Sequence, residues 1–395
     1  DTSSADDEFE NTGLVLDYNG VSMYNSVINK GMVKYHKDLD SIGISAVHRI
    51  YSFDNRTALE ALANVRYYMI RKEFTQNLPY GFSKYKDYST ETNEYTIYKN
   101  DYPLSIGYTY DKYIDNEEYE KLSAIEKQQV MLEAAVLDTK NVKSLAKEDT
   151  RSVSDKIKYG TVTVKSKDGV VVKTDRIRSK KEESTLTLSY EKKKGYEAYL
   201  MLDGVTTKKP RIKAKISTDN MEKNIVLRNN DLTYALGRDS YLINLGYSDT
   251  SESEDVTFTI PIEAKINYSD VKVCYVPMDD YVSQIEERNE ESLQNVLTDK
   301  NNEVSGNVTL SSDKVMVFSI PYSSGWKAYV DGKETSVFRA NTMYMGINLT
   351  KGSHKVVLRY NSPGLHLGMM ASAAGIIIWI LLAVASKKKK QKGNQ

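Results

Sequence analysis

The chain has 395 residues, enough for two or three domains that each bury a hydrophobic core. Its 54 lysines and arginines balance its 54 aspartates and glutamates and are mixed with them along the sequence, so nothing resembles a nucleic-acid-binding surface. Cys274 is the single cysteine, which excludes a disulfide within the chain. An exported chain of this size without a disulfide is typical of a bacterial, Gram-positive surface.

The N-terminal part combines helical and strand patterns. Residues 1–12 are acidic and polar and are predicted to be a linker, and residues 13–150 form a mixed α/β subdomain. A short helix is expected over residues 54–63, where Thr57 and Glu60 have capping-box spacing, and a strand over residues 65–70. The chain starts at Asp1 with no methionine or apolar signal region, so either a signal sequence has been removed or the chain is the C-terminal part of a longer membrane protein. A stripe of small residues on the predicted C-terminal membrane helix favours the second alternative.

A polar loop precedes these elements and is the first candidate binding segment. It combines amides, hydroxyls and a ring, which together suit contact with a sugar, in Asn19, Ser22, Tyr24, Asn25 and Ser26. An ordinary loop built on side-chain-to-backbone turns has the same composition, and the residues alone favour that interpretation.

Two further capping-box spacings follow. Asp115 with Glu118 and Ser123 with Glu126 each place an acceptor three residues before a glutamate. The second is predicted to open a helix that continues to about Leu137, with apolar side chains along one face.

Residues 151–277 form short alternating runs that predict an antiparallel β-sandwich. Hairpin turns are expected at Asp168-Gly169 and Asp203-Gly204. The predicted strands cover residues 161–165, 185–190, 198–202, 212–216, 256–260 and 271–276.

Residues 278–300 are predicted to be a helical connector, with a polar helix from Asp279 to about Val296, and residues 301–363 a β-rich region close to the membrane. Asp331-Gly332 predicts a tight hairpin and Lys351-Gly352 a turn. The pattern leaves open whether the two strand-rich parts form one sandwich or two. The predicted strands here cover residues 304–310, 315–320, 326–330, 335–339, 343–349 and 354–360.

Tyr322 lies between two of these strands and Trp326 begins the second of them. They are the second set of candidate sugar contacts, because an indole ring can stack on a sugar. The alternative, which the residues favour, is a core tryptophan beside a hairpin, since large aromatic rings are usually buried.

The end of the chain predicts one transmembrane helix over residues 364–386. Its uninterrupted apolar run of nineteen residues would span roughly 28 Å, close to the hydrocarbon thickness of a bilayer. The basic tail, residues 387–395, begins with four lysines and is predicted to be cytoplasmic, which places the bulk of the chain outside the cell. Gly368, Ala371, Ser372 and Gly375 form a stripe of small residues on the helix, which favours packing against other membrane spans.

No catalytic constellation is evident. The four histidines have no metal-ligand spacing, and nucleophile-elbow and phosphate-loop motifs are missing. We therefore expect no catalytic residue, metal or cofactor in this segment, and leave open whether a divalent metal binds in the missing N-terminal part.

Ten short motifs follow one another along almost the whole chain. They are Gly20-Val-Ser-Met-Tyr-Asn-Ser26, Leu62-Ala-Asn-Val-Arg-Tyr-Tyr68, Tyr98-Lys-Asn-Asp-Tyr-Pro-Leu-Ser-Ile-Gly-Tyr108, Asn244-Leu-Gly-Tyr247, Val304-Ser-Gly306, Ile320-Pro-Tyr322, Gly325-Trp326, Val330-Asp-Gly-Lys333, Lys351-Gly-Ser-His354 and Arg359-Tyr360. In these motifs the chain resembles the YfhO family of bacterial multi-pass membrane proteins almost from end to end. Each motif is short, and their order together with the final span makes the resemblance specific.

The resemblance implies a GT-C-like glycosyltransferase with many spans and an active site on the outer face. It further implies a polyprenyl-phosphate-linked sugar as donor and lipoteichoic acid or a related wall polymer as acceptor. The catalytic acid of such enzymes lies on an early outer loop, so this chain is expected to supply acceptor contacts and scaffold. Two alternatives stay open: a membrane-anchored, non-catalytic module that binds wall glycan or a partner protein, and an ectoenzyme complete in these residues.

Overall fold

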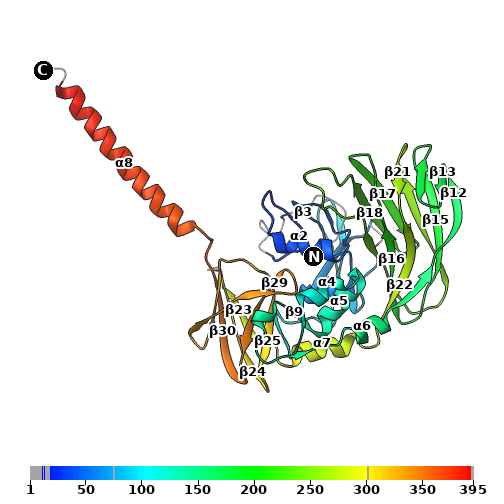
Figure 1. Cartoon of the computed structure of the whole chain (residues 1–395), viewed down its shortest axis with the longest axis horizontal. Helices are drawn as coiled ribbons and strands as arrows, with labels where there is room; N and C mark the ends of the chain where they lie inside the picture. The colour runs from blue at the N-terminus through cyan, green and yellow to red at the C-terminus, as the bar shows by residue number, and fades with distance from the viewer. Residues whose placement is uncertain (1–10, 12, 14–17, 74–75, 300–301, 393–395) are drawn as a thin grey trace.

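The computed structural model describes residues 11, 13, 18–73, 76–299 and 302–392, so the predicted linker lies almost entirely outside the described residues. The α+β class predicted from the sequence is confirmed: short helices accompany many mostly antiparallel sheets, and one long helix closes the chain (Figure 1). 

The N-terminal part holds three small sheets, with strand orders β1-β3-β2, β4-β6-β5 and β10-β8-β9. The last of them is parallel, because β8 pairs in the same direction with β9 and β10. The elements are β1 (Met23–Tyr24), α2 (Lys30–Asp38), β2 (Ile44–Ala46), β3 (Arg49–Ile50), α3 (Thr57–Leu62), β4 (Tyr67–Arg71), β5 (Phe82–Ser89), β6 (Glu94–Asn100), β7 (Gly107–Tyr110), β8 (Lys112–Asp115), α4 (Asn116–Lys121), α5 (Ala124–Glu133), β9 (Ala135–Leu137), the 3-10 turn Thr139–Asn141, β10 (Ala146–Lys147) and α6 (Arg151–Lys156).

The capping hydrogen bonds show which of the predicted helix N-termini are correct. The Ser123 capping box is present in full, and Asp115 caps α4 by accepting from the Glu118 N–H at 2.9 Å. The capping box predicted for Thr57 is wrong, because its hydroxyl donates to Glu197 Oε1 at 2.8 Å instead of capping α3. The helix predicted to reach Leu137 ends at Glu133, since the buried strand β9 pairs with β8.

The first sandwich packs the sheet β11-β22-β16-β19 against the sheet β12-β15-β20-β17-β18, with one apolar core between them. Five of the six predicted strands are present, and residues 161–165 are divided between β11 and β12, which belong to different sheets. The strands are β11 (Lys158–Thr161), β12 (Thr163–Asp168), β13 (Val170–Lys173), β14 (Arg176–Ser179), β15 (Ser184–Glu191), β16 (Tyr196–Asp203), β17 (Arg211–Thr218), β18 (Met221–Arg228), β19 (Tyr241–Ser248), β20 (Ser253–Ile260), β21 (Lys265–Asn267) and β22 (Asp270–Pro277).

The two hairpins predicted in this region are wrong. Gly169 and Gly204 both have φ of 65°, as the turn residues suggest, but each turn carries the chain into a different sheet. A turn motif specifies a change of direction and leaves the partner of the next strand undetermined.

A second sandwich packs β23-β24-β30-β26-β27 against β28-β29-β25-β7, so the chain has two sandwiches, a question that the sequence left open. The hairpin at Asp331-Gly332 is confirmed, while the predicted polar helix ends at Glu290 and the strand predicted over residues 335–339 is divided. The elements are α7 (Tyr281–Glu290), β23 (Gln294–Asp299), β24 (Glu303–Leu310), β25 (Lys314–Pro321), β26 (Trp326–Val330), β27 (Lys333–Thr335), β28 (Phe338–Ala340), β29 (Tyr344–Leu349) and β30 (Gly352–Tyr360).

The N-terminal part is built into the rest of the chain. Strand β7 pairs antiparallel with β25, from the membrane-proximal region, and one large core contains residues from Tyr35 to Tyr344. Along β25 the side chains alternate: Val315 and Val317 face this large core, and Met316 and Phe318 face the second sandwich. The predicted domain boundaries stay a prediction, and the shared sheet connects regions far apart in the sequence.

Helix α8 (Leu365–Lys392) leaves the second sandwich and projects alone from the body of the molecule (Figure 1). Its stretch Leu365–Ser386 has a mean hydropathy of 2.3 with none of it buried, so it is long and apolar enough to cross a membrane. Only residues 361–364 separate it from β30, which sets the sandwich directly beside the membrane helix.

Candidate functional site: a cleft beside a buried polar cluster

The loop that contains the first sugar-contact candidates lies on the surface. Tyr24 is 44% exposed, and its ring meets the ring of His48 edge-on at 5.6 Å. Asn25 uses its side-chain oxygen to accept from the Val27 N–H at 3.1 Å, which is the ordinary turn that the composition allowed. Asn19 and Ser26 are also exposed and Ser22 is half-buried.

The second set of candidates is divided between two places. The Tyr322 carbonyl accepts a hydrogen bond from the Asn29 side chain, just after the polar loop, and the Tyr322 ring lies 4.9 Å from the Arg339 guanidinium. Trp326 instead packs against Tyr360 at 5.1 Å, on the second sandwich and close to the start of α8. The structure therefore brings Tyr322 near the segment after the loop and gives Trp326 a structural contact at the base of the membrane helix.

A buried polar cluster, which the sequence did not predict, joins the N-terminal part to the first sandwich. Its members come from the turn before α3 and from α3, α5, β16, β18 and β19, and each is at most 9% exposed. They are Asp54, Asn55, Arg56, Thr57, Glu60, Gln128, Glu197, Tyr199, Lys223 and Asn244.

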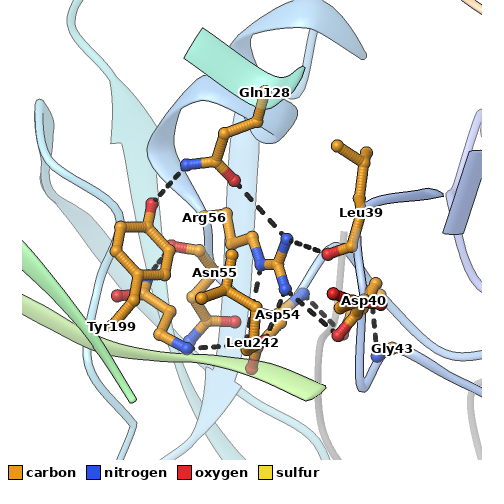
Figure 2. Close-up of polar contacts among 12 residues, drawn as sticks. Leu39, Asp40, Gly43, Asp54, Asn55, Arg56, Gln128, Tyr199 and Leu242 are labelled. Carbon is orange, nitrogen blue, oxygen red and sulfur yellow. Dashed lines mark hydrogen bonds and ion pairs between the residues drawn. The ribbon is translucent and has the colours of Figure 1, made fainter. Parts of the chain in front are cut away.

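Arg56 is the centre of this cluster, and Figure 2 shows its guanidinium in contact with Leu39, Gln128 and Leu242. It donates to the Leu39 carbonyl at 2.7 Å and to the Leu242 carbonyl, and it lies 3.5 Å from Gln128 Oε1. The Asp54 carboxylate is 3.9 Å from its Nε. A fixed fork of donors that satisfies backbone carbonyls on both sides of the junction holds the two parts of the chain together.

Asp54 and Lys223 form a buried ion pair at 2.8 Å, and the Lys223 ammonium also donates to the Asn244 carbonyl at 2.8 Å. Burial lowers the pKa of Lys223, while the Asp54 carboxylate opposes that effect. Asp54 has φ of 60°, a left-handed conformation that aspartate tolerates better than most residues. This pair therefore connects the N-terminal part to the first sandwich through buried contacts.

Two carboxyl groups in the cluster, those of Glu197 and Glu60, differ in their hydrogen bonding. Glu197 accepts from the Thr57 hydroxyl at 2.8 Å and from the Tyr199 hydroxyl at 2.5 Å. Glu60 is fully buried, and neither of its oxygens has a hydrogen-bond partner of ordinary geometry among the described residues. Burial raises the pKa of Glu60 to about 8, so this side chain is mostly neutral at pH 7.

A cleft of about 480 Å³ lies directly beside this cluster. One wall is the segment at residues 76–78, and the other is the end of the first sandwich where β15, β16, β19 and β20 meet. The polar and aromatic residues that line it include Asn77, Tyr190, Lys192, Asn220, Tyr247 and Glu254.

The buried cluster fixes the floor of the cleft. The Asn77 carbonyl accepts from Asn55 Nδ2 at 2.6 Å, and the Gly246 N–H donates to Asn244 Oδ1 at 2.7 Å. Register shifts where β19 pairs with β16, so that Leu245 is the extra residue of a β-bulge, and the next residue, Gly246, has φ of 99°. Bulges of this kind redirect a strand and its side chains beside functional sites.

The lining of the cleft combines a buried, unpartnered amide with a partly exposed ring. Both polar atoms of the Asn77 side chain are buried and have no partner among the described residues, although a buried amide normally has one. The Tyr190 hydroxyl donates to a carboxylate oxygen of Glu254 at 2.5 Å. Tyr247 is 39% exposed and packs on Tyr80 at 4.7 Å.

Sequence reasoning missed this cleft. Residues 76–78 have no local pattern that indicates binding. The Asn244-Leu-Gly-Tyr247 stretch was recognised only as one of the motifs of the family resemblance, with no binding role. The signal that was present is the glycine inside a strand pattern, which often marks a bulge or a close approach of another segment.

Replacing Gly246 with alanine should lower the free energy of unfolding by about 2–3 kcal/mol, through left-handed strain and contact with Asn77. A Cβ there would lie 3.2 Å from Asn77 Nδ2. Gly195→Ala is the matched control, because Gly195 also has positive φ but open space around it, and it should cost only about 1 kcal/mol. Chemical denaturation of the chain in detergent measures both. Equal losses would contradict the close approach of Asn77.

Comparison with known proteins gives one family. The family model described as "Bacterial membrane protein YfhO" matches residues 2–372. A Bacillus subtilis (strain 168) protein described as "Uncharacterized protein YfhO" is 25% identical over 406 residues, which cover 97% of this chain and 42% of that protein. The chain therefore spans less than half the length of this curated relative.

Similarity to solved structures is weak. The C-terminal CBM6 of LamC from Zobellia galactanivorans gives a TM-score of 0.22 at 9% identity, over 30% of this chain and 98% of that one. The mycobacterial arabinofuranosyltransferase AftD gives a TM-score of 0.19 at 15% identity, over 43% of this chain and 14% of that one. TM-scores this low support no statement about shared fold or function.

Proposed function

Because the chain belongs to the YfhO family of bacterial membrane proteins, we propose that it is the extracytoplasmic C-terminal portion of a membrane glycosyltransferase. The whole protein would transfer a sugar from a polyprenyl-phosphate donor to a wall polymer such as lipoteichoic acid. The observation that carries the proposal is the single family match that runs through the β-rich body and into α8. The bulk of the chain would lie outside the cell, with the lysine-rich end in the cytoplasm.

In this proposal the catalytic base belongs to the part of the protein that precedes this chain. A carboxylate there would remove the proton from the acceptor hydroxyl as the donor sugar is transferred. The buried carboxylates Asp54 and Glu197 have structural partners here, which supports a scaffold role for this portion. The proposed acceptor contacts near the membrane are Asn19, Ser22, Tyr24, Asn25, Ser26, Tyr322 and Trp326.

Sugar transfer by the intact protein tests this function. The full-length protein is reconstituted in liposomes with a radiolabelled polyprenyl-phosphate sugar, and lipoteichoic acid is the acceptor. We expect label in the polymer and no transfer by this 395-residue chain alone. Failure of the intact protein to label any wall polymer would favour a non-catalytic surface module, and activity of the short chain would locate the base within it.

The small-residue stripe on α8 is proposed to pack against other spans of the same protein. Gly368 and Gly375 have open space around them among the described residues, as the whole apolar part of α8 does. Leucine at both positions should reduce the yield of correctly assembled full-length protein several-fold, because helix backbones could no longer approach closely. Native gel electrophoresis of membrane extracts measures the assembled fraction.

Ile377→Val is the control for that experiment, since at 100° per residue Ile377 lies on the opposite face of α8. It should leave assembly unchanged. If the double leucine variant assembles as well as this control, the stripe is not a packing face.

A further inference from the structure

We propose that the cleft binds a pyranose ring of an oligosaccharide, and that it holds a sugar of the acceptor polymer away from the site of transfer. The assignment of the sugar to the acceptor rests on the proposed function, whereas the recognition of a sugar ring rests on the cleft itself. Nothing in the sequence pattern or in the matched family description assigns a ligand to these residues.

The size and position of the cleft suit such a ligand. Its volume of about 480 Å³ lies within the 300–1,000 Å³ that is typical of small-molecule sites. The first sandwich, which forms one wall, lies at the opposite end of the molecule from α8 (Figure 1). A polymer that extends away from the membrane could be held there while another part of it is modified near the bilayer.

The lining offers the three kinds of contact that a sugar uses. A sugar ring has apolar C–H faces, and the partly exposed Tyr247 ring offers a flat surface for one of them. Its hydroxyls both donate and accept, which matches the Asn77 amide, with its two unpartnered polar atoms. Glu254, held by the Tyr190 hydroxyl, is an acceptor for a hydroxyl hydrogen bond.

The unpartnered amide is the strongest single indication. Leaving a buried donor and acceptor unsatisfied costs about 1–3 kcal/mol for each group, so a protein rarely retains them without a partner. Asn77 is nevertheless fixed in place, because its carbonyl is bonded to Asn55 in the buried cluster and its side chain lies against Gly246. A fixed amide that awaits a partner loses little conformational entropy when a ligand hydroxyl arrives.

The same lining disfavours other ligand classes. A phosphate-rich ligand would need several basic groups, but Lys192 is the one basic side chain among the described residues that line the cleft, and Glu254 accompanies it. A lipid chain would need an extended apolar wall, whereas the apolar side chains here are Leu78, Ala198 and Leu245 together with the two tyrosine rings.

Direct binding to the whole chain in lipid nanodiscs tests the proposal. Isothermal titration uses three neutral probes, cellotetraose, maltotetraose and the tetramer of N-acetylglucosamine, with a glycerol-phosphate hexamer for comparison. We expect at least one neutral tetrasaccharide to bind, and Asn77→Ala and Tyr247→Ala to weaken that binding about tenfold or more. Asn220→Ala is a third cleft variant. Because Asn220 is an exposed residue of the lining, this substitution should leave the fold intact.

Tyr88→Ala is the matched control, because Tyr88 is a 51% exposed tyrosine on β5 that does not line the cleft. The proposal is overturned if no neutral probe binds, if only the glycerol-phosphate hexamer binds, or if the cleft variants bind as well as the control. Sugar transfer by the intact protein is assayed separately. Transfer without binding at the cleft would remove this inference alone, and binding without transfer would remove the proposed function alone.

Discussion

Replacing Arg56 with methionine will lower the free energy of unfolding by about 3–5 kcal/mol, the range measured when one partner of a buried charged network is removed. The variant leaves the carbonyls of Leu39 and Leu242 without their donor, in a region from which water is excluded. It also removes a positive charge 3.9 Å from Asp54, which remains buried. Tyrosine fluorescence during guanidinium denaturation of the chain in detergent measures the loss.

Arg151→Met is the control for this prediction. The Arg151 side chain is 84% exposed and is paired with Asp149 at 2.6 Å, so its removal should change stability by less than about 1 kcal/mol. If both variants lose the same small amount, the buried cluster does not hold the N-terminal part on the sandwich. A large loss for Arg56 alone would confirm that this arginine joins the two parts.

Local patterns in the sequence were sufficient where the structure is decided locally. The alternating strands, the Ser123 capping box and the Asp331-Gly332 hairpin each depend on residues close together in the chain, and all three are present. The apolar span also needed only composition and length. These elements fix the fold class and the membrane helix.

The same patterns failed where a distant residue offered a better partner. Thr57 with Glu60 has the same spacing as Ser123 with Glu126, yet the Thr57 hydroxyl bonds to Glu197, 140 residues away in the sequence. The turn at Asp203-Gly204 leads into another sheet because β16 already pairs with β19 and β22. Local propensity cannot anticipate competition from residues that only folding brings close.

The cleft is also formed by residues that are far apart in the sequence. Its floor depends on Asn55 bonding to the Asn77 carbonyl and on Asn244 bonding to Gly246, within a junction between the N-terminal part and the sandwich. Amides in loops are common, and their spacing in the sequence gives no sign that one will be buried without a partner. The candidates that sequence reasoning did select were chosen for composition: Tyr24 lies on the open surface, whereas Trp326 packs against Tyr360.

Replacing Glu60 with glutamine will stabilise the chain by about 3 kcal/mol at pH 7 and by much less at pH 4. Burial, aided by the nearby Asp54 charge, raises the pKa of Glu60 from 4.5 to about 8 in the folded chain. Below pH 4.5 the carboxyl is neutral in both the folded and the unfolded states, so ionisation has no effect on stability. As pH rises from 4.5 towards 8, the unfolded state releases a proton that the folded state retains, and stability falls.

Glutamine has the same shape and does not titrate, so the difference between the variant and the original chain should grow with pH and level off above about 8. Unfolding free energies of both chains, measured at pH 4, 7 and 9 in the same detergent, give this curve. Glu91→Gln, at an exposed turn between β5 and β6, should stay within about 0.5 kcal/mol throughout. A glutamine variant that is less stable at pH 9 than at pH 4, relative to the original chain, would mean that an ionised Glu60 has a stabilising partner. The buried cluster would then be a site that holds a negative charge, and its role as a neutral structural joint would have to be abandoned.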